Sequence, residues 1–232
     1  KIIKPTTGRQ FAECIDPLHV IVDTVVDPRT KGDFFLSLDK SFNMEKGQEI
    51  VLSHAINKLS IGLGWTTAEG KTLDLDASCI QLVGAKDCEE YEQRKIIYFS
   101  HMKENGIELS GDNMTGQGEG DDESFTVYLV DKEVDALAFC VCIYTTGGKF
   151  SDVTDSYIRL LDPGTNHELA RYTLHAGQTD NALIFCALVR DVHNQTSSTW
   201  SLVSIGDEVS GRVARDIKKE HFSGSKWCAM KP

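Results

Sequence analysis

The alternation of apolar and polar residues limits the fold of this chain more than any other feature. In residues 58–65 every second side chain is large and apolar, from Leu59 to Trp65, and the side chains between them are Lys, Ser or Gly. Successive side chains of a strand point to opposite faces, so this spacing predicts a strand with one buried face. Residues 124–129 repeat the pattern with Phe125 and Val127.

Further segments have the length and composition of strands, and clusters of Gly, Asp, Asn or Pro separate them. They are residues 20–26, 49–53, 78–83, 95–100, 136–144, 157–161, 168–174, 182–189 and 199–205. About ten short strands at this spacing predict an all-β fold, and an antiparallel β-sandwich in particular.

A short C-terminal helix is predicted over residues 208–221, because Val209, Val213 and Ile217 recur there every four residues. Residues 1–41 are less regular than the rest of the chain. We therefore predict an N-terminal extension over residues 1–41, a β-sandwich domain over 42–221 and a C-terminal tail over 222–232.

The charge and hydropathy of the chain exclude two classes of partner. The formal net charge of −11 disfavours binding to nucleic acid, which requires clustered Lys and Arg. The longest apolar run, residues 136–144, is much shorter than the roughly 20 residues that a membrane-spanning helix needs, so no transmembrane segment is expected. An acidic chain suits cations, provided that its carboxylates are gathered in one place.

The seven cysteines favour a reducing compartment, and we expect a cytoplasmic protein. Most of them lie in apolar, strand-like runs, where Cys behaves as a small hydrophobic residue. Cys140 and Cys142 would share one face of a strand, which allows either a metal or redox pair or a place in the core, and we favour the core. No C-x-x-C or H-E-x-x-H spacing occurs, so zinc is not expected.

Residues 112–123 form an acidic, glycine-rich segment with five carboxylates and no basic side chain. Calcium takes six to eight oxygen ligands from carboxylates, amides and carbonyls, and this segment offers all three kinds. It is not an EF-hand loop, because Met114 and Gly116 stand where that loop needs oxygen side chains. A phosphate-binding loop is disfavoured because the segment carries acids and lacks Lys.

A second acidic segment contains Asp74 and Asp76, which would point to the same face of a strand. Together with residues 112–123, these two aspartates predict a site for two cations. A solvated strand edge would explain the pair equally well if the two segments did not meet.

The two acidic segments and residues 62–65 together resemble the TerD family of tellurium-resistance and stress-response proteins. Residues 157–160 and 168–172 are similar to later strands of that family, and the resemblance runs from about residue 42 to about residue 221. It implies a β-sandwich that binds calcium at paired sites and has no established catalytic reaction. The ligands implied by the resemblance are Asp74, Asp76, Asp112, Asn113, Glu119, Asp121, Asp122 and Glu123. Glu119 stands where an Asp is usual and Gln117 where a Glu is usual, so one charge of the family's loop is absent.

The function that we expect is calcium binding without catalysis, in a stress response or in calcium-dependent signalling. The cofactor would be Ca2+, as two ions, and the partners would include proteins whose identity the sequence does not reveal. One alternative is a scaffold protein in which calcium is only structural and residues 1–41 are a docking arm. A metal-dependent hydrolase is disfavoured, because no His, Lys or Ser lies within the acidic loop to act as base or nucleophile.

Overall fold

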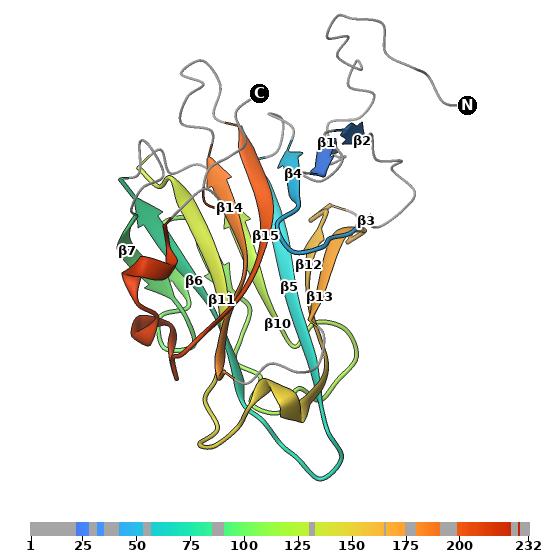
Figure 1. Ribbon diagram of the computed structural model, residues 1–232, viewed down its shortest axis with the longest axis vertical. Helices are drawn as coiled ribbons and strands as arrows, with labels where there is room; N and C mark the ends of the chain where they lie inside the picture. The colour runs from blue at the N-terminus through green and yellow to red at the C-terminus, as the bar shows by residue number, and fades with distance from the viewer. Residues whose placement is uncertain are drawn as a thin grey trace, which may run out of the picture.

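The structure is a computed structural model, and it describes eight stretches of the chain with their side chains. They are residues 43–52, 57–84, 91–129, 133–164, 166–173, 180–190, 199–223 and 227, with the strand backbone described at 22–27, 32–34, 42 and 174 as well. Two β-sheets form the two layers of the fold (Figure 1).

The first sheet has eight strands. Their order is β2 (Gly32–Phe34), β1 (Val22–Asp27), β4 (Glu49–Leu52), β15 (Trp200–Val209), β14 (Ala182–Arg190), β11 (Ala136–Ile143), β6 (Leu75–Val83) and β7 (Glu92–Ile97). The second sheet has seven strands, in the order β3 (Phe42–Asn43), β13 (Glu168–Leu174), β12 (Val153–Leu161), β5 (Lys58–Thr67), β10 (Glu123–Tyr128), β9 (Ile107–Leu109) and β8 (Lys103–Glu104). Paired strands are antiparallel except β3, which runs parallel to β13. The predicted antiparallel β-sandwich is confirmed.

The main core lies between the two sheets, and it explains the alternation in the sequence. Leu59, Ile61, Leu63 and Trp65 of β5 point into it and are at most 4% exposed. Phe125 of β10 packs against the same cluster, edge to face with Phe139 of β11. The strand predicted over residues 20–26 is present as β1, which lies in the first sheet between the edge strand β2 and β4.

A second core covers the outer face of the first sheet. β6, β11 and β14 are therefore buried on both faces, which accounts for their nearly continuous apolar sequences. Phe222 and Trp227, from the segment predicted as a tail, are fully buried in this second core. Cys140 and Cys142 also lie there as free thiols, in agreement with the core interpretation.

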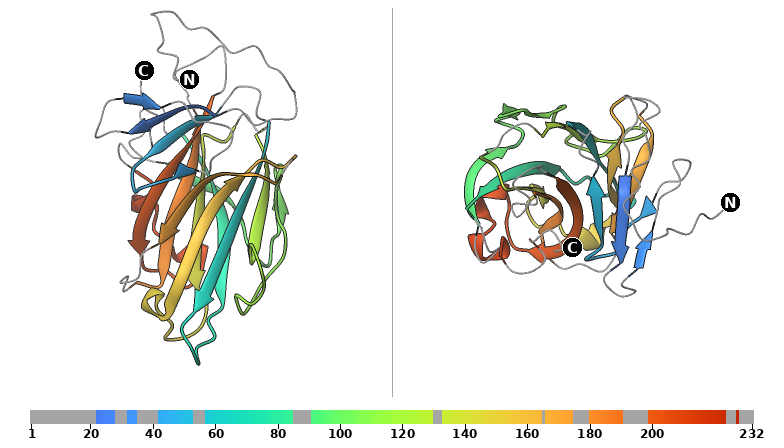
Figure 2. Two further views of the ribbon diagram at one scale, coloured as in Figure 1. Left: turned by 90° about the vertical axis from the view of Figure 1, so that its right-hand side faces the viewer. Right: turned by 90° about the horizontal axis from the view of Figure 1, so that it is seen from above.

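The helix predicted over residues 208–221 is not present. Val209 is the last residue of β15, and two short 3-10 turns follow, η2 (Ala214–Asp216) and η3 (Lys219–His221). The carboxylate of Asp216 accepts hydrogen bonds from the N–H groups of Arg212 and Val213, which closes a tight turn. These turns lie beside β6 and β7, where Ile217 packs on the second core (Figures 1 and 2). Across the described stretches, no helix has the length and hydrophobicity to cross a lipid bilayer.

Candidate metal centre

Three aspartates from the two acidic segments meet at one end of the sandwich. Asp74 directly precedes β6, Asp76 lies within β6, and Asp112 lies in the loop between β9 and β10. Each offers a carboxylate oxygen, and these oxygens lie within 4.8 Å of one another. Asp76 is 4% exposed, whereas Asp112 is exposed, so the cluster reaches from the protein interior to solvent.

Glu123 joins the acidic loop to the strand that carries Asp76. Its Oε2 accepts a hydrogen bond of 2.8 Å from the N–H of Ala77, and its Oε1 accepts one of 3.1 Å from the N–H of Asn113. Glu123 is 1% exposed and begins β10, opposite Leu63 of β5. This buried carboxylate therefore brings residues 112 and 113 next to β6.

The position of Asp74 is fixed by its backbone. The Asp74 N–H donates to Oγ1 of Thr145 at 2.9 Å, and its carbonyl accepts from the N–H of Tyr144 at 2.8 Å. Both contacts come from the residues that follow β11, the neighbour of β6 in the first sheet. The side chain of Asp74 is left to face the cluster.

The cluster carries negative charge that no described cation balances. Burial, together with the charges of Asp74 and Asp112, raises the pKa of Asp76 to about 7. Burial raises the pKa of Glu123 to about 8, although its two hydrogen bonds from N–H groups act in the opposite direction. Burial and the charge of Asp112 also raise the pKa of Asp74.

Two oxygens of the cluster are buried without a hydrogen-bond partner in the described structure, Oδ1 of Asp74 and Oδ2 of Asp76. A buried polar atom without a partner costs roughly 1–3 kcal/mol, so such atoms in a folded protein usually have a function. A bound cation would satisfy both oxygens. The atoms available as metal ligands in this cluster are carboxylate oxygens only, and such ligands suit a hard cation such as calcium.

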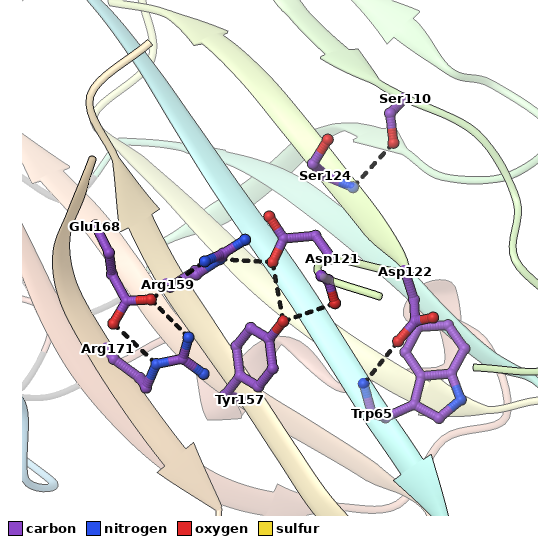
Figure 3. Close-up of polar contacts among 10 residues, drawn as sticks. Trp65, Ser110, Asp121, Asp122, Ser124, Tyr157, Arg159, Glu168 and Arg171 are labelled. Carbon is purple, nitrogen blue, oxygen red and sulfur yellow. Dashed lines mark hydrogen bonds and ion pairs between the residues drawn. The ribbon is translucent and has the colours of Figure 1, made fainter. Parts of the chain in front are cut away.

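The other acids of the loop are already bonded to protein donors. Oδ2 of Asp122 accepts from the N–H of Trp65 at 2.8 Å (Figure 3). Its Oδ1 accepts from Nδ2 of Asn113 at 2.8 Å. Oδ1 of Asn113 accepts from the N–H groups of Thr115 and Gly116. Asp122 and Asn113 therefore fix the shape of the loop.

Asp121 and Glu119 are not part of the three-aspartate cluster. Oδ1 of Asp121 accepts a hydrogen bond of 2.7 Å from Nε of Arg159. It also lies 3.2 Å from the Tyr157 hydroxyl, whose single hydrogen it shares with the Gly120 carbonyl (Figure 3). Glu119 is exposed. Of the eight ligands predicted, the structure groups Asp74, Asp76 and Asp112, with Glu123 and Asn113 next to them.

Residues outside the predicted set complete the loop's surroundings, notably Tyr157 and Arg159. One feature of the sequence could have indicated that another group packs there. Gly62 and Gly64 alternate on the outward face of β5, and glycine within a strand often marks a close approach of another group. A Cβ at Gly62 would lie 2.1 Å from an Asp121 carboxylate oxygen, and one at Gly64 would lie 2.4 Å from the ring of Tyr157.

Comparison with known protein families assigns the sequence. Residues 41–218 match the TerD domain. The chain belongs to the TerD family. The match covers both acidic segments and nearly all strands of the sandwich.

Two bacterial relatives illustrate the family. The chain is 32% identical to the tellurium resistance protein TerD of Serratia marcescens over 187 residues, which cover 75% of this chain and 94% of the relative. It is 30% identical to the stress response protein SCP2 of Bacillus subtilis over 203 residues, which cover 76% of this chain and 97% of the relative.

Solved structures share the fold of the TerD-family chain. A Streptomyces coelicolor homologue of the telluride resistance protein superposes with a TM-score of 0.52 at 18% identity, covering 67% of this chain and 92% of the homologue. A protein of unknown function superposes with a TM-score of 0.58 at 18% identity, covering 73% of this chain and 99% of that protein.

Proposed function

We propose that this TerD-family chain binds calcium at the cluster of Asp74, Asp76 and Asp112. The observation that carries the proposal is a pair of buried oxygens, Oδ1 of Asp74 and Oδ2 of Asp76. They have no hydrogen-bond partner among the described residues, and the two aspartates lie next to a third carboxylate, that of Asp112. A divalent cation would remove the repulsion among these groups and supply the missing contacts.

Calcium suits this cluster better than magnesium. Three carboxylates on a strand end and a glycine-rich loop form an irregular set of oxygens, and calcium tolerates irregular shells of six to eight oxygens. Magnesium requires a near-ideal octahedron of short contacts. Asp112 is exposed, so water can complete the coordination of the ion.

The second ion implied by the family resemblance remains a prediction. It would have to use oxygens of Asp121, Asp122 or Asn113, which already accept hydrogen bonds from protein donors. We therefore assign the tighter site to the three-aspartate cluster, where two oxygens accept no hydrogen bond from any described residue.

We further propose that the role of the chain is in a stress response, and that it is binding rather than catalysis. The support for a stress role comes from the relatives named for stress response and tellurium resistance. The three grouped side chains are all aspartates, and among the described residues no ion pair joins a His or Lys to them, which favours binding over catalysis. The buried free thiols suit a reducing compartment, and we place the protein in the cytoplasm.

A thermal-shift experiment tests calcium binding and its site. Calcium should raise the melting temperature of the wild-type protein relative to chelator, and equimolar magnesium should raise it much less. The variant Asp76→Asn should lose most of the calcium-dependent shift. The control Glu92→Gln removes one exposed charge on β7, opposite Val83 at the far end of β6, and should keep the shift. A wild-type protein that melts at one temperature in chelator and in millimolar calcium would rule the proposal out.

A further inference from the structure

Arg159 holds the acidic loop on the outer face of the second sheet. Its Nε donates to Oδ1 of Asp121 at 2.7 Å, and the two side chains are only 20% and 13% exposed. The hydroxyl of Tyr157 donates to the carbonyl of Gly120 at 2.8 Å (Figure 3). The loop is thus bound through both a side chain and its backbone, immediately before the residues that reach the metal cluster.

The sheet is shaped to receive this part of the loop. Arg159 of β12 is the cross-strand partner of Gly62 on β5, and Tyr157 is the partner of Gly64. The Asp121 carboxylate occupies the space that a Cβ at Gly62 would take, and the Tyr157 ring occupies that at Gly64. The position of Asp121 therefore depends on β5 and β12, whereas the metal cluster depends on β6 and Asp112.

A second layer of contacts fixes Arg159 itself. Glu168 accepts from Nη1 of Arg159 at 3.3 Å and from Nη2 of Arg171 at 2.6 Å. The Arg171 guanidinium lies 3.8 Å from the centre of the Tyr157 ring, which places a cation against an aromatic face (Figure 3). Two cations and two carboxylates balance one another in this cluster, so the charge of Asp121 is already compensated.

A short path connects Arg159 to the metal cluster. Asp121 is followed by Asp122, which accepts from the Trp65 N–H, and then by Glu123, which accepts from the Ala77 and Asn113 N–H groups. Adjacent residues of a strand point to opposite faces, so a shift of one residue here would turn Glu123 away from Ala77. The N–H of Asn113 donates to Glu123, and Asn113 directly follows Asp112 in the chain. Displacement of Glu123 would therefore break this hydrogen bond and free both Asn113 and Asp112 to move.

We propose that Arg159 is a positioning residue for the metal site and that Asp121 is its anchor rather than a ligand. The inference rests on the proposed calcium binding at the three-aspartate cluster. Arg159 fixes Asp121 on β5, which sets the register of Asp122 and Glu123 and thereby the place of Asp112. Residues that orient metal ligands typically contribute 10–100-fold to metal affinity.

The first test compares two mostly buried Arg–Asp pairs, Arg159–Asp121 and Arg190–Asp135. Arg159→Met removes the anchor, and Arg190→Met breaks the Arg190–Asp135 pair, which has a contact of 2.5 Å and side-chain exposures of 13% and 20%. Asp135 lies by Leu82, at the opposite end of β6 from Asp76. Both variants should melt at a lower temperature. Arg159→Met should bind calcium at least about tenfold more weakly in a calorimetric titration, while Arg190→Met should bind within about twofold of the wild type.

A double-variant comparison separates an anchor from a ligand. If Arg159 acts through Asp121, then Asp121→Asn should weaken calcium binding about as much as Arg159→Met, and the double variant should be no worse than either. An Asp121→Asn variant much weaker than Arg159→Met would make Asp121 a ligand and overturn the inference. If Arg159→Met does not fold, Arg159→Lys takes its place, since Lys keeps the charge but loses the planar fork.

Amide hydrogen exchange in chelator tests the anchor without calcium. The N–H groups of Asn113 and Ala77 should exchange faster in Arg159→Met than in the wild type, and should be unchanged in Arg190→Met. If the wild type binds no calcium, the proposed function fails while this measurement still tests the anchor. If the wild type binds calcium, and Arg159→Met matches it in affinity and exchange, Arg159 has only a structural role and the inference is overturned.

Discussion

The N–H of Ala77 donates a hydrogen bond of 2.8 Å to Oε2 of Glu123, although the two residues are 46 positions apart in the sequence. Ala77 follows Asp76 in β6, and Glu123 ends the acidic loop and begins β10. This contact joins one sheet to the other at the place where the aspartates meet. It explains how two short acidic segments form a single cluster.

The stability of the metal-free protein should fall as the pH rises from about 4 to about 8. A carboxyl whose pKa is higher in the folded protein than its ordinary value binds its proton more tightly when folded. Below the ordinary pKa of the carboxyl, this tighter proton binding contributes its full amount to the free energy of unfolding. The contribution is lost as the pH rises through the pKa in the folded protein, which is about 7 for Asp76 and about 8 for Glu123. Urea unfolding in chelator at several pH values measures the effect. A free energy of unfolding that rises over this range would contradict it.

Calcium should reverse this dependence on pH. The ion binds carboxylates in their deprotonated form, so its binding to Asp76 and its neighbours should release protons and tighten as the pH rises. Calorimetric titrations of calcium in several buffers that differ in ionisation enthalpy measure how many protons are released for each ion bound. Asp76→Asn should reduce that count, and an unchanged count would place the proton on another group.

Gly62→Ala should destabilise the protein by about 1–3 kcal/mol, because the new Cβ would lie 2.1 Å from the Asp121 carboxylate. Chemical denaturation measures the change. Gly111→Ala is the matched control, since a Cβ at Gly111 meets no atom within 4 Å. Equal effects at the two positions would mean that the loop does not rest on Gly62.

Trp227→Ala should cost about 3–5 kcal/mol of unfolding free energy, because Trp227 is fully buried in the second core against Tyr91 and Phe222. Met114→Ala, at a side chain that is 61% exposed, should change the stability little. Denaturant midpoints of both variants provide the comparison. A Trp227→Ala variant as stable as wild type would show that the C-terminal segment does not contribute to the core.

Local pattern in the sequence was sufficient to predict the longer strands, but neither the strands of two or three residues nor the C-terminal segment. In β5 the alternation from Leu59 to Trp65 follows directly from one buried face. Val209, Val213 and Ile217 have helical spacing, yet Val209 belongs to a strand and Ile217 follows a 3-10 turn. Both lie in the second core, which forms only when the first sheet is complete, so no local pattern reveals it.

The candidate site could also be predicted only in part, because some of its residues are visible in local sequence and others depend on how the strands pair. Asp74, Asp76 and Asp112 stand out because acids gathered in short segments are visible in a sequence. Arg159 does not, because its contact with Asp121 depends on the register between β5 and β12. The alternating glycines of β5 could have indicated a close approach, but the identity of the approaching group required the pairing of the strands.

Calorimetric titration of calcium into metal-free wild-type protein and into Asp76→Asn tests the central claim most directly. The wild type should bind with a stoichiometry of at least one ion per chain. The variant should lose the tighter site, because an amide keeps the size of the side chain but lacks the charge. Far-ultraviolet circular dichroism should show that its sheets are intact. An Asp76→Asn isotherm with the affinity and stoichiometry of the wild type would contradict the claim that this cluster binds the ion.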